Sequence, residues 1–130
     1  MTDKKRCYIA GPMRNHPNFN FDAFDQAKQE VEALGYHPIS PADMDRIYEG
    51  WGKYPPEDWQ PTAEEATHMI LRDLDVIANQ CDAIYLLEGW ETSSGANAER
   101  AFIDFLQGFR RFEVLYQTED APIGYSEVPC

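Results

Sequence analysis

A glutamate just inside a predicted helix is the residue of this chain whose position most favours chemistry. Glu99 follows the run Ser93 to Ala98, which comes soon after a short apolar strand. A Ser/Gly-lined helix start after a strand presents free backbone N–H groups that bind anions, and it favours a nearby ionised carboxylate. Glu99 is therefore a candidate nucleophile or base beside a sugar or phosphate. The same pattern also fits a surface glutamate that only stabilises the helix.

A second carboxylate, Asp73, lies on the inward side of another predicted helix. It is three residues after Ile70 and four before Ile77, both in the apolar stripe of that helix. A carboxylate there is costly unless it is hydrogen-bonded or used in function. A pair with Arg72 or Arg14 would satisfy it, but we favour a role in a cleft.

Two further residues can join these carboxylates. Tyr8 lies in the first predicted strand, where its hydroxyl can orient a carboxylate or simply be part of a core aromatic. Arg14, in the loop that follows, is a candidate anion ligand. Glu99 is expected at the border of the buried face of its helix, whose apolar stripe is Ala98, Ala101, Phe102, Phe105, Leu106 and Phe109. The three histidines form no metal-binding pattern, so we expect neither a metal nor a cofactor.

Strands and helices alternate along the chain. The expected strands are Cys7–Ala10, Tyr36–Ile39, Ala83–Leu87 and Phe112–Tyr116, and the expected helices run from the N-cap Asn20 to Gly35, from Thr62 to about Gln80 and from Ser94 to about Gly108. This order predicts an α/β fold, a single three-layer flavodoxin-like (Rossmann-like) domain with a parallel sheet of four to five strands. Ligands of such sheets bind beyond the carboxyl ends of the strands. The site should lie between the loop Gly11–Asn20 and the loop after Leu87.

Two segments have no regular pattern. Residues 42–61 are expected to be irregular and to form a lid or insert, whose aromatic residues Trp51, Tyr54 and Trp59 stack on a ligand or pack onto the domain. The tail, residues 117–130, carries turn residues and little periodicity.

Composition excludes some classes of function. The 130 residues fit one domain, and the net charge of −12 disfavours binding to nucleic acids or anionic membranes. Acidity also permits an interaction protein that mimics DNA, but solubility is the simpler explanation. Three cysteines without paired spacing argue against disulfides. No long apolar run is present, so we expect a cytoplasmic protein without a membrane span.

Taken together, these residues resemble the nucleoside 2-deoxyribosyltransferase superfamily, which includes deoxynucleoside 5′-monophosphate N-glycosidases. The resemblance rests on Tyr8-Ile9-Ala10-Gly11-Pro12-Met13, on Asp73 and on Gly95-Ala96-Asn97-Ala98-Glu99, and it extends from Tyr8 to about Leu115. The run from Cys81 to Glu99 is most similar to a branch common in bacteria and their phages.

The resemblance implies cleavage of the N-glycosidic bond of a (deoxy)nucleoside or its 5′-monophosphate with retention. Glu99 would form a covalent glycosyl ester, Asp73 would serve the leaving base as general acid, and Tyr8 would hold the nucleophile. The expected substrate-binding residues are Gly11, Met13, Arg14, Asn20, Trp90, Ser93, Ser94 and Gly95.

Three related expectations follow from the resemblance. A second base in place of water would make the protein a deoxyribosyltransferase, and loss of turnover would leave a nucleotide-binding or sequestering protein. The protein should form a homodimer or higher homo-oligomer, in which the tail Ile123–Cys130 can complete a neighbour's site.

Overall fold

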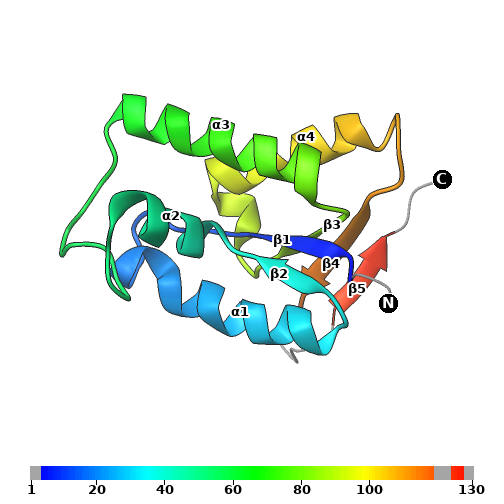
Figure 1. Ribbon diagram of the computed structural model, residues 1–130, viewed down its shortest axis with the longest axis horizontal. Coiled ribbons are helices and arrows are strands. Elements are labelled where there is room, and N and C mark those ends of the chain that lie inside the picture. Colours follow the sequence, from blue (N-terminus) through cyan, green and yellow to red (C-terminus); the bar gives the residue numbers. More distant parts are fainter. Residues whose placement is uncertain (1–3, 119–123, 128–130) are drawn as a thin grey trace.

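A central five-stranded sheet organises the molecule (Figure 1). The computed structural model describes residues 4–118 and 124–127. In the order β2-β1-β3-β4-β5, the strands are His37–Ile39, Arg6–Ala10, Ala83–Leu86, Glu113–Gln117 and Gly124–Glu127. The first four are mutually parallel, and β5 is antiparallel to β4.

Helices cover both faces of this sheet. Helix α1 packs on one face, and α3 and α4 lie together on the other (Figure 1). The helices are α1 (Phe21–Ala33), α2 (Pro41–Glu49), α3 (Ala63–Gln80) and α4 (Ser94–Leu106), with short 3₁₀ turns at Pro17–Asn20 and Trp90–Thr92. The predicted three-layer, flavodoxin-like α/β fold is confirmed.

Strand alternation decides which side chains meet which helices. In β1, Cys7 and Ile9 belong to the core on the α1 side, whereas Tyr8 and Ala10 belong to the core under α3 and α4. Strand β3 divides its residues in the same way and is buried along its whole length, as expected of a central parallel strand. Tyr8 is therefore fixed on the face that carries Asp73 and Glu99.

Most predicted helix ends are confirmed, with one exception. Thr62 and Glu65 form the expected capping box at the start of α3, and α1 ends just before Gly35, which has a φ of 96°. Asn20 occupies the N-cap position of α1, as predicted, but its side chain makes no capping hydrogen bond. Asn20 is left-handed, with a φ of 63°, and its amide donates to the carbonyl of Pro12 at 2.7 Å.

The expectation that residues 42–61 are irregular is wrong for the first part, because α2 forms there. Ser40 caps it by accepting from the N–H of Ala42, and Gly50 ends it with a φ of 72°. This helix buries Pro41, Ala42 and Asp45 but exposes its larger apolar residues Ile47 and Tyr48. The usual apolar stripe is therefore missing from its sequence.

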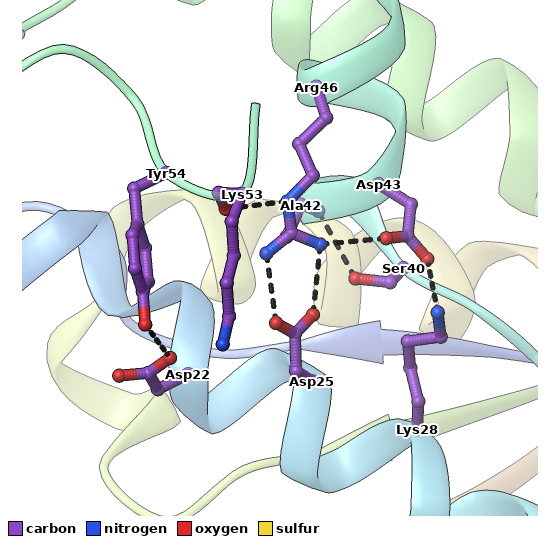
Figure 2. Close-up of polar contacts among 9 residues, drawn as sticks. All are labelled: Asp22, Asp25, Lys28, Ser40, Ala42, Asp43, Arg46, Lys53 and Tyr54. Atoms are coloured by element: carbon purple, nitrogen blue, oxygen red, sulfur yellow. Dashed lines mark hydrogen bonds and ion pairs between the residues drawn. The ribbon is translucent and has the colours of Figure 1, made fainter. Parts of the chain in front are cut away.

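Ion pairs hold α2 against α1 (Figure 2). Both terminal nitrogens of Arg46 bind Asp25 of α1 at 2.9 Å, a bidentate pair. Asp43 binds Arg46 at 2.8 Å and Lys28 at 2.7 Å. Polar contacts thus anchor a helix that has few apolar ones.

The aromatic residues after α2 pack onto the domain. The rings of Trp51 and Trp59 lie 4.7 Å apart, and Phe19 lies 5.3 Å from Trp59. Trp51, Trp59 and Tyr54 pack against the core on the α1 side, and the Tyr54 hydroxyl donates to Asp22 at 2.8 Å (Figure 2). Of the two roles considered for these rings, the structure supports packing.

Part of the C-terminal tail is regular, contrary to expectation. Strand β5 pairs with β4, with Gly124 opposite Gln117 and Glu127 opposite Val114. Its backbone hydrogen bonds need no particular side-chain pattern. Residues 119–123 and 128–130 of the tail, including Cys130, lie outside the described residues. Residues 1–3 lie outside them as well. No described helix has both the length and the apolar character needed to cross a membrane.

Candidate active site

A cavity of about 890 Å³ opens at the carboxyl ends of β1 and β3. These two strands are neighbours, but the chain continues from β1 to one side of the sheet and from β3 to the other. Such a switch point is the usual ligand site of an open parallel sheet, and the volume is typical of ligand pockets. The walls come from the loop after β1, the first half of α3 and the start of α4. A cavity is therefore present at the edge of the sheet where the sequence predicts the site.

Tyr8 and Glu99 meet at the floor of this cavity. The Tyr8 hydroxyl donates a 2.5 Å hydrogen bond to Oε2 of Glu99. Tyr8 is completely buried and Glu99 is 5% exposed, yet both line the cavity. One comes from β1 and the other from α4, so the sheet and the helix together fix the direction of the carboxylate.

Asp73 reaches the same floor from α3 and is 8% exposed. Its Oδ1 accepts from Nε and Nη2 of Arg72 at 3.0 and 2.7 Å. Arg72 also binds Oδ1 of Asp45, on α2, through Nη1 at 2.8 Å. One guanidinium thus lies between two buried carboxylates.

The environment makes Glu99 and Asp73 compete for a proton. Burial raises the pKa of Glu99 well above its usual value, the negative charge of Asp73 raises it further, and the Tyr8 bond opposes this. Burial also raises the pKa of Asp73, against the effect of Arg72. Ionisation of Asp73 therefore favours a proton on Glu99, so the titrations of the two carboxyls are linked. Burial likewise raises the pKa of Tyr8, so its hydroxyl remains a donor.

The start of α4 places groups that suit an anion at one end of the cavity. Ser93 caps the helix by accepting from the N–H of Ala96 at 3.1 Å. Arg14 donates to the Ser94 hydroxyl at 3.0 Å, which holds a positive charge beside the helix start. Gly95 lines the same end. The first N–H groups of a helix, a hydroxyl and a guanidinium together favour a phosphate or carboxylate group.

Gly11 allows the two loops at the switch point to approach closely. A Cβ at this position would lie 2.8 Å from the side chain of Leu87, closer than real Cβ contacts. Only glycine fits there without moving β1 away from β3.

Most of the predicted site residues lie together. Those that line the cavity are Tyr8, Gly11, Met13, Arg14, Asp73, Ser93, Ser94, Gly95 and Glu99. Asn20 and Trp90 are not lining residues. The Asn20 amide is held by Pro12, and Trp90 packs against the core on the α3 and α4 side.

The predicted apolar stripe of α4 is partly wrong. Phe105 and Phe109 are exposed, and the buried residues of this helix are Ala96, Glu99 and Ile103. Glu99 is thus in the middle of the buried face rather than at its border. The sequence pattern misled because Phe105 and Phe109, which belong to the predicted stripe, face outward, whereas Glu99 faces inward with Ile103.

Asp45 is the residue near the site that sequence reasoning missed. It is 2% exposed. The Ser40-Pro41 start and the Gly50 stop are the signals that would have placed it on a helix. Within residues 4–118 and 124–127, no group of three or more His, Cys, Asp or Glu side chains is arranged to hold a metal ion. The chemistry of the described site is that of two carboxylates, one able to attack and one able to carry a proton.

The family comparison covers the whole site. No curated protein matches the chain. A family model described as a domain of unknown function, DUF4406, matches residues 5–107, from the start of β1 to just past α4. This segment contains Tyr8, Asp73 and Glu99 and is more than half of the chain. The chain therefore belongs to the DUF4406 family.

Proposed function

We propose that this protein cleaves the N-glycosidic bond of a (deoxy)nucleoside or its 5′-monophosphate with retention of configuration. The observation that carries the proposal is the 2.5 Å bond from Tyr8 to Glu99, on the floor of a cavity that Asp73 also lines. It is the arrangement expected of an oriented nucleophile beside a proton carrier. The resemblance of these residues to nucleoside 2-deoxyribosyltransferases also supports cleavage of an N-glycosidic bond.

In the first step, a Glu99 oxygen attacks C1′ of the sugar. The C1′–N bond breaks, its electron pair leaves with the base, and Asp73 gives that base a proton. A glycosyl ester to Glu99 remains. In the second step water adds to C1′ and releases Glu99, while Asp73 takes back a proton. Since Glu99 must attack as a carboxylate, the proton has to be on Asp73 when the base departs.

Two geometric features favour retention. Tyr8 binds Oε2 of Glu99, which leaves Oε1 outside that bond. Asp73 lines the same cavity floor as Glu99, and its charge raises the pKa of Glu99. A second carboxyl group beside the nucleophile is what a retaining mechanism needs to carry the proton.

The groups at the α4 end of the cavity support a 5′-monophosphate. The chain has a net charge of −12, which repels a phosphate over long range. Arg14, held by Ser94 at the start of α4, supplies a local positive charge that offsets this repulsion.

The test is release of free base from deoxynucleosides and their 5′-monophosphates, followed by chromatography. Glu99→Ala should lower the rate by about 1,000-fold or more, as for loss of a nucleophile. Glu91→Ala is the matched control because Glu91 is exposed, near the start of the same helix. Mass spectrometry should detect a glycosyl adduct on Glu99. If Glu99→Ala keeps full activity, or no substrate of either type releases base or exchanges it, the proposal is wrong.

The same experiment separates the related activities. Base transfer would give a new nucleoside when a second base is added. A protein that only binds nucleotides would show a higher melting temperature with ligand, no free base, and nearly unchanged affinity in Glu99→Gln.

A further inference from the structure

We infer that Asp45 is a positioning residue of this site. Asp45 binds the end of the Arg72 guanidinium that Asp73 does not bind, and so weakens the effect of the positive charge of Arg72 on Asp73. The inference rests on the proposed function, because it concerns the residue that would serve the leaving base. It adds a residue from α2, an element that neither the catalytic carboxylates nor Tyr8 come from.

The contacts describe a chain of charges that ends at the cavity. Asp45 Oδ1 binds Nη1 of Arg72 at 2.8 Å, and the Nε and Nη2 edge of Arg72 binds Asp73. Asp73 lines the cavity, but Asp45 and Arg72 are not among its lining residues. Asp45 therefore acts on a ligand only through Arg72 and Asp73.

Docking of α2 onto α1 does not need this buried carboxylate. Asp45 is 2% exposed, and its Oδ2 has no hydrogen-bond partner among the described residues. An unsatisfied buried carboxylate oxygen is costly. Arg46 and Asp43 already fasten α2 to α1 through Asp25 and Lys28 (Figure 2). A neutral residue at position 45 would leave those contacts in place.

The charge of Asp45 changes how readily Asp73 holds a proton. The charged groups that face Asp45 are Arg72 and Asp73 of α3 and Glu49 of α2. Burial raises the pKa of Asp45 to about 6, against the effect of Arg72, so Asp45 is mainly ionised at neutral pH. A negative charge nearby favours the protonated form of a carboxyl.

Asp73 itself faces the positive Arg72, the neutral hydroxyl of Tyr8 and the carboxyl of Glu99. Arg72 favours its ionised form, whereas the general acid of the proposed reaction has to carry a proton. By engaging Nη1 of Arg72 and adding a negative charge, Asp45 offsets this effect. Asp73 can then compete with Glu99 for a proton.

The test is the titration of the Asp73 carboxyl, followed by NMR of protein with ¹³C-labelled aspartate. The Asp73 signal is identified as the one absent from Asp73→Asn. In Asp45→Asn the Asp73 titration should move to lower pH by about one unit. The alkaline limb of kcat/KM should move in the same direction, because the protonated acid is lost earlier. Asp43→Asn, on the same helix, should leave both unchanged.

A second measurement needs no variant. In the wild-type protein the Asp73 signal should show a step near pH 6, where Asp45 itself titrates. An unmoved Asp73 titration in folded Asp45→Asn, or no such step in the wild type, would overturn the inference. If the NMR results appear as expected but no substrate is cleaved, the proposed function fails, and the effect of Asp45 on Asp73 stands. If cleavage is found and the Asp73 titration is the same in Asp45→Asn as in the wild type, only the inference about Asp45 fails.

Discussion

Glu99→Gln should stabilise the folded protein at high pH and leave its stability nearly unchanged at low pH. The folded state raises the pKa of Glu99, first by burial and then through the charge of Asp73. Protonated Glu99 thus contributes its full stability below the unfolded pKa of about 4.3, and this contribution is lost as pH rises through the higher folded value. Glutamine is neutral at every pH, and its carbonyl can still accept the Tyr8 bond.

The magnitude follows from the repulsion that the substitution removes. Two like charges about 4 Å apart repel by about 4 kcal/mol at an effective dielectric constant of about 20. A proton on either carboxyl relieves part of this, so we expect a gain of about 1–3 kcal/mol at pH 8.5. In a domain of this size each kcal/mol changes the melting temperature by roughly 3–5 °C.

The assay is thermal unfolding followed by circular dichroism at pH 5.5, 7 and 8.5. Glu91→Gln removes the same charge from an exposed position and is the control for net charge. The reasoning is refuted if Glu99→Gln is less stable than the wild type at pH 8.5, or if its gain is as large at pH 5.5 as at pH 8.5.

Two further substitutions test the geometry of the cleft. Tyr8→Phe removes the donor to Glu99, and since such a bond to a charged group contributes about 1.5–3 kcal/mol, base release should fall by roughly 10- to 100-fold in kcat/KM. Tyr36→Phe, which loses a bond to Glu113 far from the cavity, should keep its activity. Gly11→Ala should lower the free energy of unfolding in urea by about 1–3 kcal/mol, because its Cβ would collide with Leu87. Gly52→Ala, with no atom within 4 Å of the added carbon, should show no such loss.

The sequence was informative where local signals agreed. The capping residues Thr62 and Glu65 predicted the start of α3, and its period put Asp73 and Ile77 on the same side, where both are buried. The short apolar run at Ala83–Leu86 predicted a central strand. In open parallel sheets, ligands bind beyond the carboxyl ends of the strands. This rule placed the cavity at the ends of β1 and β3.

The sequence was uninformative where burial did not follow hydrophobicity. Helix α2 turns Asp45 inward and Ile47 outward, so its pattern hides both the helix and the buried carboxylate. Tyr8 and Glu99 are 91 residues apart in the chain, and no spacing rule joins them. Their contact depends on the register of β1 in the sheet and on where α4 packs against it, and both are set by tertiary structure.

Helix α3 carries a consequence for motion. Its buried residues are Asp73 and Ile77, both in the second half. The first half, which includes Ala66, Thr67 and Ile70, borders the cavity with no buried residue of its own. Amide hydrogens before residue 71 should therefore exchange with solvent sooner than those after it. A ligand in the cavity would give this half the contacts it lacks, so slower exchange there would report occupancy of the site without any need for turnover.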